Sequence, residues 1–201
     1  MRKLLTTTFI TLDGVMQAPG GPGEDDDGGF TQGGWSVHYW DEALDAAMGE
    51  IMGREFEFLL GRKTYEIFAA YWPTSTEVGA DVINNARKHV VSRSLEAVDW
   101  NNTTLIRGDA VPEIARLKAM DGPELQVHGS SNLIQTLLKN DLIDEIHLFI
   151  FPVAIGKGKR YFGDGTDPAA FKLASSTTSN SGVIIATYVR DGALQTGTFG
   201  V

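Results

Sequence analysis

The residues most suited to chemistry in this 201-residue sequence lie in two glycine-containing loops. The first is Leu60-Gly61-Arg62-Lys63-Thr64-Tyr65-Glu66, which follows a short apolar run and leads into a segment with helical spacing. The second is His128-Gly129-Ser130-Ser131-Asn132, placed in the same way between an expected strand and an expected helix. Glycine lets the backbone approach a ligand closely, and a helix start offers free N–H groups. With cations and hydroxyls beside them, these loops are suited to hold phosphate.

The hydrophobic pattern predicts the framework that must position these loops. Strands are expected at residues 4–12, 56–60, 88–92, 103–106, 125–128, 143–153, 172–178 and 183–189. Helices are expected at 40–51, 64–70, 82–86, 112–120 and 133–139, and the Gly- and Asp-rich stretch 17–34 is interpreted as a long mobile loop. This alternation predicts an α/β fold in one domain, residues 1–201. Its mixed sheet is expected to be parallel at the centre and antiparallel at the C-terminal edge, with helices on both faces.

Composition excludes several classes of protein. No apolar run is long enough to span a bilayer, and the short apolar start is followed at once by three threonines, so we expect a cytoplasmic protein. Without cysteine there are no disulfides or thiolate sites, the histidines show no ligand spacing, and no metal is expected. The net charge of −9 argues against nucleic-acid binding. The acidic run Glu24–Asp27 is interpreted as a solvated loop, since EF-hand spacing is missing.

Four loops are expected at the carboxyl ends of the strands, where ligands of such sheets lie. They are Asp13-Gly14-Val15-Met16, Gly61-Arg62-Lys63-Thr64, Ser92-Arg93-Ser94 and Gly129-Ser130-Ser131-Asn132. Three of them offer hydroxyls, arginines or N–H groups freed by glycine, which together suit a dinucleotide. A 2′-phosphate favours a planar guanidinium that binds it bidentately, so Arg62 and Arg93 favour NADPH over NADH. Any one of these loops alone is better interpreted as a turn.

Six motifs, taken in order, carry a family resemblance. They are Thr11-Leu12-Asp13-Gly14, Leu60-Gly61-Arg62-Lys63-Thr64-Tyr65-Glu66, Val90-Val91-Ser92-Arg93, Val127-His128-Gly129-Ser130, Leu142-Ile143-Asp144-Glu145-Ile146 and Phe151-Pro152-Val153-Ala154-Ile155-Gly156-Lys157-Gly158. The chain resembles the dihydrofolate reductase fold and, more closely, stand-alone relatives of the C-terminal reductase half of bacterial bifunctional riboflavin-biosynthesis enzymes. The zinc deaminase half of those enzymes needs paired cysteines, so this chain is not expected to perform that step.

The resemblance implies NADPH as the cofactor and assigns contacts by position. It implies phosphate contacts at Gly61, Arg62, Lys63 and Thr64, and contacts with the adenosine 2′-phosphate at Ser92 and Arg93. It implies that Gly129, Ser130, Ser131 and Asn132 lie under the pyrophosphate and nicotinamide side, and that Val15 and Met16 cover the nicotinamide. The long loop and an aromatic wall from Trp35, Tyr39 and Trp40 would keep the site dry.

Two carboxylates, Asp13 and Asp41, are the candidate catalytic groups on the substrate side. Asp13 is equally well interpreted as a turn residue before Gly14, and Asp41 as the N-cap of the helix that follows it. Lys157 and Lys159 are candidates for a substrate phosphate or, alternatively, residues of a solvated turn.

We therefore expect an NADPH-dependent reductase that transfers hydride to a small heterocyclic or conjugated substrate and forms a homodimer. Two other classes stay open. One is a nucleotide-binding module without turnover. The other is a structural homodimer that kept the fold and lost the pocket, with the apolar stretch Ile146–Ile155 as its interface. The structural homodimer predicts no affinity for a cofactor, which separates it from the other two.

Overall fold

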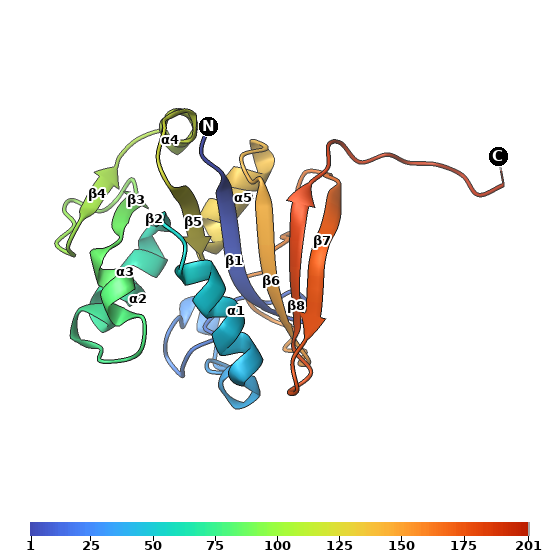
Figure 1. Ribbon diagram of the computed structural model, residues 1–201, viewed down its shortest axis with the longest axis horizontal. Coiled ribbons are helices and arrows are strands. Elements are labelled where there is room, and N and C mark those ends of the chain that lie inside the picture. Colours follow the sequence, from blue (N-terminus) through green and yellow to red (C-terminus); the bar gives the residue numbers. More distant parts are fainter. Residues whose placement is uncertain (201) are drawn as a thin grey trace.

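The computed structural model describes residues 1–200, and its central feature is an eight-stranded sheet (Figure 1). The strands lie in the order β4-β3-β2-β5-β1-β6-β8-β7. Their bounds are β1 (Leu4–Thr11), β2 (Phe56–Gly61), β3 (Arg87–Val91), β4 (Thr103–Ile106), β5 (Glu124–His128), β6 (Glu145–Phe151), β7 (Phe171–Thr178) and β8 (Ile184–Arg190). The pairs from β4 to β6 are parallel, whereas β8 runs antiparallel to both β6 and β7. The predicted fold class is confirmed.

Helices cover both faces of the sheet. They are α1 (Glu42–Met52), α2 (Arg62–Tyr71), α3 (Ala80–Asn85), α4 (Ala110–Ala119) and α5 (Ser131–Lys139), with short 3-10 turns η1 (Asp27–Gly29), η2 (Val37–Tyr39) and η3 (Trp72–Thr74). In β1, Leu4 and Ile10 share a hydrophobic cluster with α4 and α5, while Phe9 packs with α1. Because side chains one residue apart point to opposite faces of a strand, these helices lie on opposite faces. Figure 1 shows α1 in front of the sheet and α5 behind it.

The expected elements are present within residues 1–200, and each helix start differs by two residues from the expected one: α1 begins two residues later, and the other helices begin two residues earlier. α2 begins at Arg62 rather than at residue 64, and α5 begins at Ser131 rather than at residue 133. Both helices therefore start inside the glycine-containing loops, which brings their N–H groups closer to the predicted site. None of the helices in residues 1–200 combines the length and the apolar character needed to cross a membrane.

The expectation that the apolar stretch Ile146–Ile155 forms a dimer interface is wrong for residues 146–151. The strand β6 ends at Phe151 and pairs along one edge with β1 and along the other with β8. Its side chains Ile146, Phe149 and Phe151 are at most 1% exposed. A strand paired on both edges and buried on both faces has no surface left for a second subunit, so residues 146–151 are an internal part of the fold, whereas Pro152 and Ala154 after the strand are exposed.

Candidate functional site

The four loops identified from the sequence follow β1, β2, β3 and β5, which lie near one another in the sheet. Because these strands are parallel, all four loops lie along the same edge. The loops after β2, β3 and β5 touch directly through side chains. The loop after β1 instead pairs with the chain that follows β6. We use the term cradle for residues 61–64 together with residues 129–132.

Ser130 joins the two halves of the cradle. Its hydroxyl accepts a hydrogen bond from the N–H of Gly61 at 2.9 Å and donates one to the Thr64 hydroxyl at 2.9 Å. A Cβ on Gly61 would lie 3.4 Å from the Ser130 side chain, so the two loops approach closely. Thr64 is buried by this contact. The sequence predicts that these residues serve one ligand, and the structure brings them together.

The backbone of the second loop adopts a conformation that suits glycine. Gly129 and Ser130 have φ angles of 61° and 62°, in the left-handed region. A Cβ on Gly129 would lie 3.4 Å from the Thr64 hydroxyl oxygen. Ser131 and Asn132 follow as the first residues of α5, the former half-buried and the latter exposed. This left-handed turn directs the start of α5 toward the cradle.

Two helices begin at the cradle without a side-chain cap. Neither Gly61 before α2 nor Ser130 before α5 has a side chain that accepts a hydrogen bond from the first helical turn. By contrast, Asp41 caps α1 and Asp109 caps α4. The first N–H groups of a helix have no partner within the helix, and they carry partial positive charge. Two neighbouring uncapped helix starts favour an anion at the cradle.

Arg62 extends the cradle toward the loop after β3. Its guanidinium donates to the Ser94 hydroxyl at 2.8 Å and to Glu66 at 2.7 Å, and its side chain is about half exposed. Ser92 is buried, and its hydroxyl accepts from the N–H groups of Ser94 and Leu95. Arg93 is exposed on the same loop. Arg62 and Ser94 thus present donors at the edge of the cradle, while Ser92 shapes the turn.

Val15 and Met16 are buried and held by backbone hydrogen bonds. The Val15 carbonyl accepts from the Thr11 N–H, and the Val15 N–H donates to the Thr11 hydroxyl, both at 2.9 Å; Val15 also forms an antiparallel bridge with Arg160. The N–H of Met16 donates to the carbonyl of Lys159 at 2.8 Å. Met16 also packs in one hydrophobic cluster with residues of α5. The structure therefore places Met16 in the same hydrophobic core as the helix that starts at the cradle. Contact with a nicotinamide stays a prediction.

Asp13 fastens the loop after β6. Its carboxylate accepts from the Thr11 hydroxyl at 2.6 Å, from the Ile155 N–H at 3.1 Å and from the Gly156 N–H at 2.7 Å. The hydrogen bond from Thr11 is the largest cause that lowers the pKa of Asp13 to about 2. At neutral pH this group is ionised and cannot donate a proton. The contacts show a positional role for Asp13, and a catalytic role stays a prediction without support from them.

Asp41 is the N-cap of α1, the alternative that the sequence left open. One carboxylate oxygen accepts from the N–H groups of Ala43 and Leu44 at 3.1 and 3.3 Å, and the other accepts from the N–H of Ser181 at 3.0 Å. Burial opposes ionisation, but these hydrogen bonds outweigh it and lower the pKa of Asp41. The carboxylate stabilises the helix start and ties it to the β7–β8 turn, and a direct catalytic part is not supported by these contacts.

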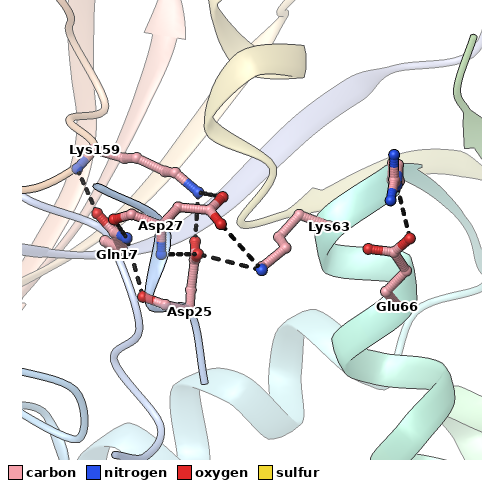
Figure 2. Close-up of polar contacts among 7 residues, drawn as sticks. Gln17, Asp25, Asp27, Lys63, Glu66 and Lys159 are labelled. Carbon is pink, nitrogen blue, oxygen red and sulfur yellow. Dashed lines mark hydrogen bonds and ion pairs between the residues drawn. The ribbon is translucent and has the colours of Figure 1, made fainter. Parts of the chain in front are cut away.

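Lys63 lies in a charge cluster with Asp25, Asp27 and Lys159 (Figure 2). Its ammonium is 3.3 Å from Asp27 and 3.6 Å from Asp25, and the Lys159 ammonium is 2.7 and 2.6 Å from the same carboxylates. The hydrogen bond to Asp27 raises the pKa of Lys63. Asp25 is 7% exposed. The interpretation of the acidic run as wholly solvated is therefore wrong at Asp25.

His128 ends β5 directly before the cradle. Its ring nitrogen is 2.9 Å from the Gln126 side-chain oxygen, and its ring packs edge-on against Phe58. Burial, together with the nearby His147, lowers the pKa of His128 to about 4. The imidazole is therefore neutral at physiological pH. His128 therefore directly precedes Gly129 as an uncharged polar group held by Gln126 and Phe58.

The sequence matches the RibD C-terminal domain family over residues 2–185. This chain belongs to that family. The match covers β1 to β7, the first two residues of β8, and α1 to α5, so the cradle and the charge cluster both lie inside the RibD C-terminal domain.

Known proteins are similar to this RibD C-terminal domain over nearly its whole length. The uncharacterized protein YyaP of Bacillus subtilis (strain 168) is 27% identical over 93% of this chain and 94% of its own. A Shewanella sp. PV-4 protein named for riboflavin biosynthesis has a crystal structure that matches 95% of this chain and 99% of its own, with a TM-score of 0.66 and 21% identity. Dihydrofolate reductase from Enterococcus faecalis, solved in complex with NADP(H), matches 94% of this chain and 96% of its own, with a TM-score of 0.59 and 13% identity. These structures show that the fold is shared.

Sequence reasoning missed the part that Gln17 and Lys159 play in this RibD C-terminal domain. Lys159 is considered above as a ligand for a substrate phosphate or as part of a solvated turn, yet its ammonium is engaged by Asp25 and Asp27. Gln17, 3% exposed, donates to the carbonyls of Asp25 and Asp27 and accepts from the Lys159 N–H, each at 3.0 Å. An acidic run and a lysine-containing turn in one chain were the available signal, but nothing local showed that they meet.

Proposed function

We propose that this RibD C-terminal domain is an NADPH-dependent reductase that transfers hydride to a small heterocyclic or conjugated substrate. The observation that carries the proposal is the cradle, where two uncapped helix starts are joined by the Ser130 hydroxyl. Such an arrangement favours bound phosphate. The family also includes reductase domains, and one protein of the same fold was solved with NADP(H).

The residues of the site fit the parts of NADPH. The N–H groups at the starts of α2 and α5 would hold the pyrophosphate, with Lys63 as a neighbouring cation. Arg62, joined to Ser94, would bind the 2′-phosphate, because a guanidinium offers planar, paired donors. Arg93 is exposed nearby on the same loop. When bound, the nicotinamide of NADPH supplies the hydride.

The chain's own contribution to the reaction would be to bind, orient and exclude water. Val15 and Met16, both buried, would close one side of the site. Two of the aromatic residues expected from the sequence pack near the ends of β1 and β6. The ring centroids are 5.5 Å apart for Trp40 and Phe9, and 5.3 Å apart for Trp35 and Phe151. Trp40 is 40% exposed and offers a flat surface to a planar substrate. Because Asp13 and Asp41 are held ionised by other contacts, we assign neither of them as the proton donor.

The first experiment is a titration of the purified protein with NADPH and with NADH, followed by quenching of tryptophan fluorescence. We expect NADPH to bind more tightly. Arg62→Ala should weaken NADPH binding about tenfold or more, because charge-assisted hydrogen bonds are each worth about 1.5–3 kcal/mol, and should leave NADH binding nearly unchanged. Arg116→Ala removes an exposed arginine from α4 and is the matched control. Equal losses for both cofactors in Arg62→Ala would contradict the assignment of a 2′-phosphate site.

The same titration separates the other classes of function. Tight binding of NADPH, followed by no loss of nicotinamide absorbance with any planar heterocycle, would favour a binding module without turnover. No binding of either cofactor would favour the structural homodimer. The homodimer itself stays a prediction, now without the interface that the sequence suggested.

A further inference from the structure

We propose that Asp27 competes with bound phosphate for Lys63, so that the loop 17–34 is fastened to the cradle until an anionic ligand takes the lysine. This inference rests on the proposed function, since it concerns the regulation of the same site. The loop reaches the cradle at the first turn of α2, where the Lys63 ammonium is 3.3 Å from an Asp27 oxygen. Figure 2 shows Asp27 between Lys63 and Lys159.

The ion pair between Lys63 and Asp27 lies on the surface. The side chains of Lys63 and Asp27 are 45% and 53% exposed, so water and ligand reach both. Ion pairs of this kind form and break readily and are weak. The carboxylate of Asp27 also pairs with Lys63, the cation in the first turn of α2, whose uncapped start adjoins that of α5. A bound phosphate and Asp27 would therefore draw on the same positive charge.

The contacts that Lys159 and Gln17 make with the loop differ from the Lys63–Asp27 pair, because they do not depend on Lys63. Asp25 is buried and pairs with Lys159 at 2.6 Å. Gln17 holds the backbone of residues 25–27 through two hydrogen bonds of 3.0 Å, and it also accepts from the Lys159 N–H. These bonds would persist after Lys63 leaves. Asp27 also keeps its ion pair with Lys159, at 2.7 Å, so the loop stays anchored at Gln17 and Lys159 while its contact with Lys63 breaks.

The charge balance of the cluster couples phosphate binding to loss of the Lys63–Asp27 ion pair. In the structure, two lysines face two carboxylates, so the cluster is neutral. If Lys63 turns to a phosphate, Lys159 alone faces Asp25 and Asp27, and the excess negative charge repels the phosphate. Ligand binding and the Lys63–Asp27 contact therefore oppose each other, and by linkage each weakens the other equally. Gln17 of this loop accepts a hydrogen bond from the Trp35 indole N–H at 2.8 Å, and the loop precedes α1, so loss of the Lys63 contact would loosen the covering of the site as the cofactor arrives.

The test compares Asp27→Asn with Asp26→Asn. Both substitutions remove one negative charge from neighbouring exposed positions, but Asp26 makes no ion pair within residues 1–200. Asp27→Asn removes the ion pairs of Asp27 with both Lys63 and Lys159. Because it frees Lys63 from an exposed ion pair, we expect it to bind NADPH about twofold to fivefold more tightly than wild type, and Asp26→Asn to match wild type. Equal affinity in Asp27→Asn and wild type would overturn the proposal, as would equal tightening in both variants.

A second measurement does not depend on NADPH. Hydrogen–deuterium exchange of the amides in residues 17–34 is followed in the whole protein with inorganic pyrophosphate and, at matched ionic strength, with potassium chloride. We expect pyrophosphate alone to speed exchange in wild type, and Asp27→Asn to exchange fast from the start. If NADPH fails to bind but pyrophosphate still speeds exchange, the proposed reductase function fails and the competition stands. If pyrophosphate leaves exchange unchanged, the competition is overturned whatever NADPH does.

Discussion

Replacing Gly129 with alanine gives a sharp test of the cradle, because the backbone there is in the left-handed region, with φ of 61°. An L-residue in that region costs about 1–2 kcal/mol relative to glycine. Alanine also lowers the entropy of the unfolded chain, which returns about 0.4–1 kcal/mol to the folded state. The added Cβ would lie 3.4 Å from the Thr64 hydroxyl oxygen, an ordinary contact, so steric overlap adds little. The net expectation is a loss of about 1 kcal/mol in the free energy of unfolding.

Gly49 is the matched control. It lies inside α1, and a Cβ there would meet no atom within 4 Å. Gly49→Ala should therefore stabilise the protein by about 0.5–1 kcal/mol, since glycine is a poor helix former. The same chemical change is thus expected to have opposite signs at the two positions.

Urea denaturation measures both variants. With a slope of about 2 kcal/mol/M, the midpoint should fall by about 0.5 M for Gly129→Ala and rise by about 0.3–0.5 M for Gly49→Ala, with the slope unchanged. NADPH affinity should fall only in Gly129→Ala, because relief of the strain would move the start of α5. A Gly129→Ala protein as stable as wild type would refute the assignment of a strained turn at the cradle.

Two further predictions concern the contacts that hold the neighbouring loops. Gln17→Ala removes three hydrogen bonds of a buried side chain and should lower the free energy of unfolding by about 2 kcal/mol. Gln32→Ala in the exposed part of the same loop should change it little, and similar effects from both would contradict the anchoring role of Gln17. Asp13 has a pKa lowered from 3.8 to about 2, so its carboxylate contributes stability that is present above about pH 4 and lost as the pH falls toward 2. Asp13→Asn should flatten the dependence of stability on pH in that window, as measured by denaturation between pH 6 and pH 2; an unchanged dependence would show that these contacts do not stabilise the ionised form.

Local sequence determined the elements and the composition of the cradle. Periodicity shows strands and helices because side-chain direction repeats every two residues in a strand and every 3.6 in a helix. The loops at Gly61 and Gly129 could also be located from the sequence, since glycine is a strong local marker of turns and loops between regular elements. The two possible roles of Asp41 were visible too, because an N-cap depends only on residues within one helical turn.

Tertiary structure alone decided which loops meet and which charges remain available. Lys63 pairs with Asp27 across 36 residues, Asp13 fastens Ile155 across 142, and β6 lies between β1 and β8. Such contacts depend on the order of strands in the sheet, and no local pattern encodes that order. A lysine in a phosphate-like loop looks free in the sequence, yet here it is already held by a carboxylate. The reason is that charges act through space, at distances that only the folded chain sets.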